Sequence, residues 1–194
     1  VQKPSISVSY FSLAVFRKNL DVYLSMFLRH MGAVAVWIIL PLYMAFLGAS
    51  NFWIGIIYAI NPSIQFLIMR RLDKFRNEWL IKWGIITSGL SFVSYSLAQD
   101  FYSIVPGMIL IAFGWSFLYV GANQLVVERS IEKASSAGIL NSTTSAADIA
   151  GSMIGGLIMQ YFGFRETMVF AVICSILAMM VFSWINRSPH KSTI

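Results

Sequence analysis

Six long apolar blocks separated by short polar links constrain the fold of this chain of 194 residues more than any other feature. A helix needs about 20 consecutive apolar residues to cross the hydrocarbon core of a bilayer. Runs of this kind cover residues 22–47, 52–69, 79–98, 102–127, 137–160 and 167–186. None of the links is long enough to hold a soluble domain. The pattern therefore predicts an all-α, polytopic membrane protein with six transmembrane helices, embedded in a lipid bilayer.

The composition excludes an ordinary soluble domain. Apolar residues make up 58% of the chain and charged residues only 11%, whereas a soluble domain carries about 25% charged residues. The net charge of +6 does not indicate a nucleic-acid partner, because the basic residues are concentrated in the links between apolar blocks. The single cysteine, Cys174, lies inside an apolar block and is predicted to pack there.

The distribution of basic residues predicts the orientation in the membrane. Twelve of the 14 Lys and Arg residues fall on one face if the chain crosses the membrane at each apolar block. The positive-inside rule places that face in the cytoplasm, together with both termini. We therefore expect a multi-pass protein of the plasma (inner) membrane. In this interpretation residues 1–21 form a cytoplasmic linker with a short interfacial helix, and residues 187–194 form a cytoplasmic tail.

Two charged residues lie deep inside the predicted spans. Arg29 and Asp148 are each roughly ten positions from the cytoplasmic end of their helix, which is about 15 Å at the helical rise. A charge at this depth costs about 2.5–3.5 kcal/mol on insertion scales. We therefore expect both side chains to face a shared aqueous cavity, where they could form an ion pair and Asp148 could carry a coupling proton. A purely structural buried pair is the alternative.

Other polar and aromatic side chains recur at the spacing of one helical face. These faces predict a cavity-lining or solute-binding set, although each could also serve helix packing. In the first block the set comprises His30 and Trp37, which accompany Arg29, and in the second block it comprises Tyr58, Asn61 and Gln65. The fourth block contributes Trp115, Tyr119 and Asn123, and the fifth contributes Asn141 and Thr144, which accompany Asp148.

Small residues and proline predict local helix geometry. Small side chains let neighbouring helices approach closely, and they recur at Gly55, Ala59 and Ser63 and again at Gly151, Gly155 and Gly156. Pro62 removes a backbone hydrogen bond, so we expect a kink in the second helix. The hydroxyl side chains of the third block, including Ser88, are expected to bond their own backbone and are assigned no role.

The sequence gives no indication of an enzyme. No Gly-rich loop with Lys and Ser or Thr is present to bind a nucleotide phosphate. A nucleophile with a base, or a metal cluster, is not visible, because the histidines are only His30 and His190 and Cys174 lies on the last, predicted lipid-facing block. We therefore expect no metal, no cofactor and no catalytic residue.

Several short motifs are similar to those of a known family. They are the sequences FRKNL at residues 16–20, LPLY at 40–43 and GAS at 48–50, the glycine-containing fifth block, and the link at residues 69–78. In that link Asp73 and Lys74 match a cytoplasmic signature whose two glycines are replaced here by Met69 and Arg76. On these residues the chain resembles the C-terminal six-helix half of a major facilitator superfamily transporter.

The resemblance implies an architecture and an activity. Such a carrier has two six-helix halves, each made of two inverted three-helix repeats, that rock around a site near the midplane. It implies secondary active transport of a small solute by alternating access, as a symporter or antiporter. It also implies that the third and sixth helices face lipid, and that the loop with Asp73, Lys74 and Arg76 acts as a gate. The partner would be an N-terminal half or a second copy; a homodimeric half-carrier and a six-helix channel remain alternatives.

Overall fold

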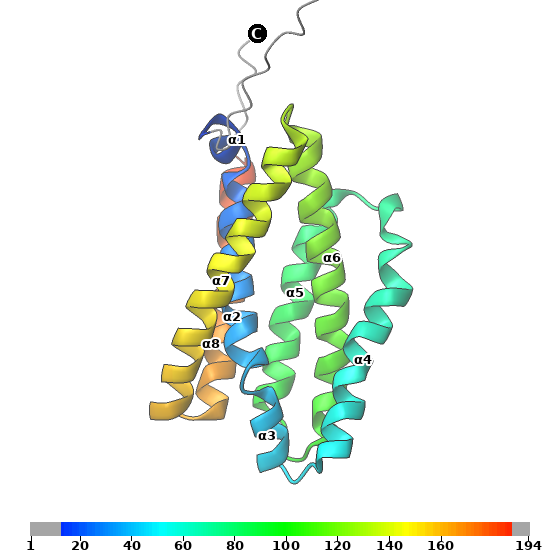
Figure 1. The fold of residues 1–194 in the computed structure, drawn as a ribbon, viewed down its shortest axis with the longest axis vertical. Helices are drawn as coiled ribbons and strands as arrows, with labels where there is room; N and C mark the ends of the chain where they lie inside the picture. The colour runs from blue at the N-terminus through cyan, green and yellow to red at the C-terminus, as the bar shows by residue number, and fades with distance from the viewer. Residues whose placement is uncertain (1–12, 188–194) are drawn as a thin grey trace, which may run out of the picture.

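The computed structural model describes residues 13–187, which form a bundle of long helices running side by side (Figure 1). The predictions for residues 1–12 and 188–194 lie outside the described part of the chain. The helices are α1 (Leu13–Lys18), α2 (Leu20–Trp37), α3 (Leu40–Phe46), α4 (Asn51–Met69), α5 (Asn77–Ser96), α6 (Val105–Arg129), α7 (Lys133–Tyr161) and α8 (Phe164–Arg187). Two short 3-10 helices, Leu72–Lys74 and Tyr102–Ile104, precede α5 and α6.

Four helical segments among the described residues are long and apolar enough to cross a membrane. They are Leu20–Phe46, Asn51–Met69, Tyr102–Arg129 and Phe164–Ile185. Helices α5 and α7 lie in the same bundle but carry more polar residues, so composition alone does not mark them as spans. The structure thus shows an all-helical protein with four candidate spans.

The sequence predicts one helix for the first span, but the structure has two helices there, α2 and α3. Pro41 has no N–H to donate to the carbonyl of Trp37, four residues earlier, and its ring crowds that turn. Helix α2 accordingly ends at Trp37, and α3 begins at Leu40. The hydroxyl of Tyr58 on α4 donates to the Trp37 carbonyl at 3.0 Å. The break therefore supplies an acceptor that ties α2 to α4.

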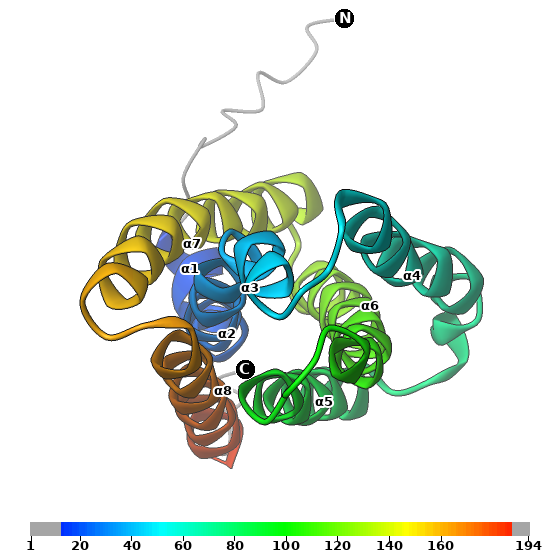
Figure 2. The same cartoon turned by 90° about the horizontal axis from the view of Figure 1, so that it is seen from below.

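Helix α4 is the least buried of the four candidate spans, and only Ile57 and Asn61 are buried along it. The helix continues through Pro62. A Cβ at Gly55 would meet no atom within 4 Å, and Ala59 and Ser63 are exposed, so within residues 13–187 no helix packs closely against this stripe of small residues. Figure 2 shows α4 and α7 on one side of the bundle and α5 and α8 on the other.

Glycines allow the closest helix contacts in the bundle. A Cβ on Gly155 of α7 would lie 2.5 Å from the Cα of Ala35 on α2, and one on Gly151 would lie 2.4 Å from the carbonyl oxygen of Met31. The predicted tight crossing at these two positions is confirmed, whereas Gly156 faces open space. Cys174 is buried against α2, as expected.

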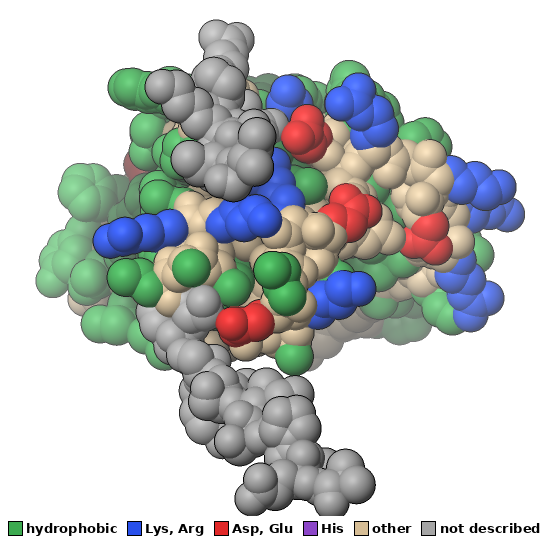
Figure 3. Space-filling view, turned by 90° about the horizontal axis from the view of Figure 1, so that it is seen from above, with side chains coloured by type: hydrophobic (Ala, Val, Ile, Leu, Met, Phe, Trp, Pro, Cys, Tyr) green, Lys and Arg blue, Asp and Glu red, His purple; other side chains and the backbone are tan. Residues whose placement is uncertain are grey.

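Both ends of the described chain, α1 and the last turns of α8, lie at the same end of the bundle (Figure 1). Lys and Arg side chains gather on this end, which Figure 3 views from above. At the opposite end the carboxyl of Asp100 accepts hydrogen bonds from the backbone N–H and the hydroxyl of Ser103, both at 2.8 Å. These bonds, led by the backbone one, hold the pKa of Asp100 below its ordinary value.

Candidate solute-binding cavity

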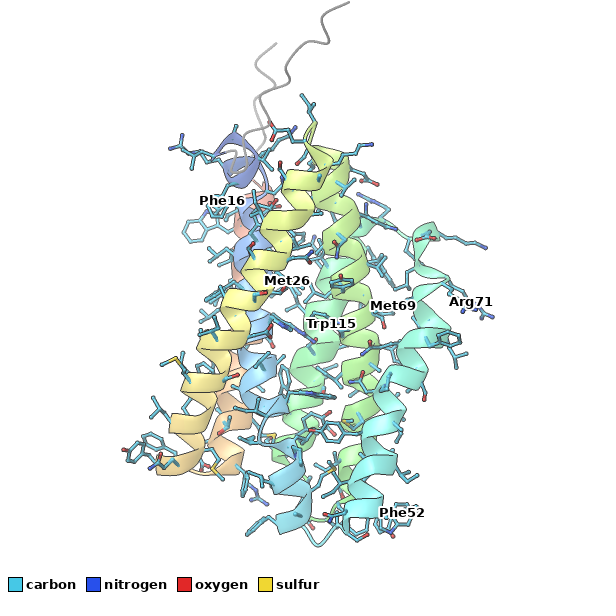
Figure 4. The ribbon with its side chains drawn as sticks, in the orientation of Figure 1. Phe16, Met26, Phe52, Met69, Arg71 and Trp115 are labelled. Carbon is cyan, nitrogen blue, oxygen red and sulfur yellow. The ribbon has the colours of Figure 1, made fainter. Side chains whose placement is uncertain are left out.

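A cavity of about 250 Å³ lies in the middle of the bundle, with walls from α2, α4, α5, α6 and α7. Figure 4 shows one of its lining residues, Trp115, near mid-height between Phe52 at one end and Phe16 at the other. The structure brings seven residues of the sequence-predicted set together here: Arg29, His30, Trp37, Asn61, Gln65, Trp115 and Asp148.

A larger hollow of about 730 Å³ opens between α1, α2 and α7. Phe16, Phe27 and Ala146 are among its lining residues, and its surface is largely apolar. It holds none of the predicted site residues. Size alone therefore does not select the site, because recognition of a solute needs convergent polar groups.

Arg29 is the most buried charged residue of the cavity, with 1% of its surface exposed. Its Nε and Nη2 atoms donate to the hydroxyl oxygen of Ser88 on α5, at 2.9 and 2.6 Å. The guanidinium carbon lies 5.5 Å from the centre of the Trp115 ring. Arg29 is thus held by a neutral hydroxyl and an aromatic face.

Asp148 pairs with His30, so the expected pairing with Arg29 is wrong. The Nε2 atom of His30 lies 3.0 Å from Oδ1 of Asp148. Successive residues on a helix point about 100° apart, so when Arg29 faces α5 its neighbour His30 faces α7. The His30 ring also stacks on Trp115 with ring centres 4.9 Å apart. The Asp148 side chain is 55% exposed, so its carboxylate lies at the open rim of the cavity.

Helix α4 supplies the amide wall of the cavity. The Gln65 side-chain amide donates to the amide oxygen of Asn61 one turn earlier. Tyr58 lies just outside the cavity, where its ring packs against Trp37 with centres 4.7 Å apart. Tyr58, Asn61 and Gln65 thus lie on successive turns of one face of α4, and Tyr58 connects this face to α2.

Four predicted residues lie away from the cavity. The Tyr119 ring stacks on Trp115, with centres 5.2 Å apart, and Asn123 donates to the Tyr119 carbonyl at 2.9 Å. On α7 the Thr144 hydroxyl donates to the carbonyl of Asn141 at 2.8 Å. None of the four lines the cavity among the described residues, although Tyr119 extends the aromatic stack of its wall.

Comparison with known proteins decides the family. Residues 22–194 match the family described as Major Facilitator Superfamily. The chain belongs to this superfamily. Two curated relatives carry the name "Quinolone resistance protein NorA", from Staphylococcus aureus strains MRSA252 and Mu50; each is 24% identical over 178 residues, which cover 89% of this chain and 46% of the relative. The chain thus spans about half the length of the curated relatives that it matches. Family membership and the apolar helices identify an integral membrane protein of a transporter family.

The loop that resembles the superfamily signature contacts the bundle through buried Leu72 and through the carboxylate of Asp73. Asp73 accepts a hydrogen bond from the side-chain amide of Gln124 on α6 at 2.9 Å. Lys74 and Arg76 are exposed, and the guanidinium of Arg76 comes only within 4.0 Å of Glu78. Of the three signature residues, only Asp73 thus has a polar contact with α6, and the gating role of the three residues stays a prediction.

Beside this loop lies a charge network that sequence reasoning missed. Nη1 of Arg129, at the end of α6, lies 2.7 Å from Oδ2 and 3.0 Å from Oδ1 of Asp21 on α2. Its Nη2 lies 3.6 Å from Oε1 of Glu78 on α5. One arginine thus ties the same end of the three helices α2, α5 and α6 together.

Helix α5 has an exposed apolar face, which includes Trp83, Ile86 and Leu90 and agrees with the lipid-facing role that the resemblance implies, but its opposite face contributes to the cavity. It is packed between α6 and α8, and its Phe92 and Tyr95 line the cavity. Its Ser88 holds Arg29. The depth of Ser88 was a usable signal, because it lies roughly as many residues from the end of α5 as Arg29 does from the same end of α2.

Removal of the Ser88 hydroxyl is expected to destabilise the protein. Hydrogen bonds to charged groups contribute about 1.5–3 kcal/mol, and Ser88→Ala takes away the acceptor of two of them. We expect a loss of about 2 kcal/mol in unfolding free energy, measured by SDS titration in mixed micelles. Ser96→Ala is the matched control, because the Ser96 hydroxyl bonds only to the carbonyl of Val93 on the same helix. Equal losses in the two variants would contradict the role of Ser88.

Proposed function

We propose that this chain is one six-helix half of a secondary carrier that moves a small solute through the mid-bundle cavity by alternating access. The observation that carries the proposal is the cavity itself, in which charged, aromatic and amide side chains converge from α2, α4, α6 and α7. Carriers with repeated halves bind their solutes near the midplane, between the halves. Membership of a transporter superfamily supports the same conclusion.

The proposal treats α5 and α7 as membrane spans as well. Helix α5 has 20 residues, which at the helical rise is about 30 Å, the thickness of the hydrocarbon core. Its buried serines bond within the bundle, as Ser91 does to the carbonyl of Gly107 at 2.8 Å. The polar face of α7 around Asp148 would then meet the translocation path. Six spans agree with both chain ends lying at the basic end of the bundle, which we assign to the cytoplasm.

The other wall of the translocation path would come from a second six-helix unit. The relatives are about twice as long as the matched region, and halves of such carriers are related by an axis along the membrane normal. An N-terminal half of the same carrier is therefore the preferred partner. A second copy of this chain could occupy the same place.

Asp148 is the proposed proton-coupling group. Its carboxylate lies at the open rim of the cavity and accepts a bond from His30, so it links α7 to α2. Protonation of the carboxylate would remove its charge and weaken this link. Because the link joins two helices that line the path, its strength would bias one conformation of the carrier over the other.

Asp148→Asn tests the coupling in the full-length carrier reconstituted into proteoliposomes, with a quinolone and benzoate as first probes. Wild-type carrier is expected to accumulate a probe when a pH gradient is imposed. The variant should lose about tenfold or more of this accumulation and keep counterflow exchange, which needs no net proton movement. Glu166→Gln, which removes an exposed carboxylate at the start of α8, is the control.

The possible outcomes separate the components of the proposal. Unchanged gradient-driven accumulation in Asp148→Asn would exclude Asp148 as the coupling group. Steady ionic conductance without counterflow in a planar bilayer would favour a channel. If the wild-type carrier exchanged neither probe, the proposed solute path would lose its support.

A further inference from the structure

We propose that the cavity binds a small organic anion, with Arg29 receiving its carboxylate and the aromatic wall receiving its body. This inference rests on the proposed function, since it names the class of solute for the same cavity. It begins from a physical cost: a guanidinium buried in the middle of a membrane protein needs compensation by an opposite charge or by water. Arg29 has hydrogen-bond and aromatic partners, but no ion pair among residues 13–187.

The contacts of Arg29 leave one edge of the guanidinium available. The group has five N–H donors, and the Ser88 oxygen accepts from Nε and from Nη2. Ser88 in turn donates to the Gly84 carbonyl at 2.6 Å, so this oxygen is fixed in position. Nη1 and the remaining N–H of Nη2 form the fork that binds carboxylates with two parallel hydrogen bonds.

No carboxylate within residues 13–187 lies within 4.0 Å of the Arg29 guanidinium. Asp148, the acidic residue that shares the cavity, is bonded to His30. Ser88 and Trp115 offer a hydroxyl oxygen and a ring face, which orient the guanidinium but do not neutralise it. A buried cation held in place without a counter-charge is an anion-binding group.

The depth of Arg29 favours a small ligand over a carboxylate from another protein segment. These helices alone leave only 1% of Arg29 exposed, so a second half packed on their surface would not contact it directly. The route to Arg29 is the cavity of about 250 Å³, somewhat below the range of about 300–1,000 Å³ that is typical of ligand pockets. Such a space suits a ligand of one ring and a carboxylate.

The other walls of the cavity favour a flat apolar body on that ligand. Trp115, Phe92 and Tyr95 present aromatic surface beside Arg29. Ring stacking and apolar burial would hold such a body, while the Asn61–Gln65 amide pair on the far wall could bond a polar substituent. A neutral or cationic analogue of the same shape would leave the guanidinium without its partner.

The test is equilibrium binding of radiolabelled benzoate to the purified full-length carrier, followed by scintillation proximity. Benzamide and benzylamine serve as competitors, because they keep the ring and replace the anion by a neutral or a cationic group. We expect saturable benzoate binding, with both competitors at least about tenfold weaker than unlabelled benzoate. Arg29→Lys, which keeps the charge but loses the fork, should weaken binding about tenfold, and Arg29→Gln should abolish it. Lys82→Gln, which removes an exposed cation from α5, is the control and should bind as wild type does.

Three results would overturn the anion site: no saturable benzoate binding, equal competition by benzamide or benzylamine, or unchanged binding in Arg29→Gln. The competition series uses wild-type protein, so it decides the question even if the Arg29 variants fail to fold. A carboxylate supplied by the rest of the carrier would occupy Arg29 and give the first of these results. Counterflow of a quinolone without benzoate binding would support the proposed transport function and reject the anion site. Benzoate binding without any counterflow would support the anion site and reject the proposed transport function.

Discussion

Arg129→Met is expected to lower the unfolding free energy by about 3 kcal/mol, toward the lower end of the range for a broken buried ion pair. Asp21 is the reason, because its side chain is only 4% exposed and its partner is Arg129 at 2.7 Å. Removal of the arginine leaves the carboxylate desolvated without a counter-charge. The effect sits low in the range because Arg129 itself is 23% exposed and water already screens part of the attraction. Unfolding in an SDS titration of mixed micelles measures the change.

Two further variants check this explanation. Asp21→Asn combined with Arg129→Met should recover much of the loss, because no unpaired carboxylate remains. Arg76→Met should change stability by less than about 0.5 kcal/mol, because Arg76 is exposed and its contact with Glu78 is long. A double variant as unstable as Arg129→Met alone would mean that packing of the arginine side chain, rather than charge, holds the three helices.

Gly84→Ala is expected to destabilise the protein by about 2–3 kcal/mol, although alanine is the better helix former. A Cβ at this position would lie 2.6 Å from the backbone nitrogen of Leu118 and 2.9 Å from the carbonyl oxygen of Gly114. Both atoms belong to the backbone of α6, so no side chain can rotate away and the two helices must separate. The separation would also displace Ser88, one turn along α5. The SDS titration again gives the change.

Gly89→Ala is the matched control on the same helix. Its Cβ would meet the Cβ of Ser175 at 3.5 Å, an ordinary contact. We expect this variant to be neutral or slightly stabilising, by up to about 1 kcal/mol from helix propensity. If both alanine variants proved neutral, the close approach of α5 and α6 would not be essential to the fold.

Much of the helical framework could be predicted from residue patterns. Apolar blocks of membrane length became helices because a backbone in lipid must satisfy its own hydrogen bonds. The break after Trp37 was not predicted, since an apolar run conceals the local effect of Pro41. The bounds of α7 extend beyond its apolar block to Lys133, because backbone hydrogen bonds continue a helix past the residue where hydropathy falls.

The sequence predicted which residues form the candidate site better than it predicted which of them contact each other. Depth and helical spacing selected Arg29, Trp115 and Asp148, and all three line one cavity. The pairing was wrong, because depth gives the height of a side chain along the bundle but not its direction around the helix axis. Ser88 was passed over for a related reason: its depth matched that of Arg29, but the sequence does not show whether a serine bonds only its own backbone or also accepts from an arginine.

The sequence by itself determined that most of this protein lies in lipid, that its fold is helical, and how deep along each helix the charged side chains lie. These follow from local composition, because lipid acts on each segment separately. Tertiary structure decided which helix faces which: that Arg29 points to α5 and His30 to α7, that Asp21 meets Arg129, and that Gly84 lets two backbones touch. Rotation of each helix about its axis is set by all its neighbours together, and no single segment contains that information.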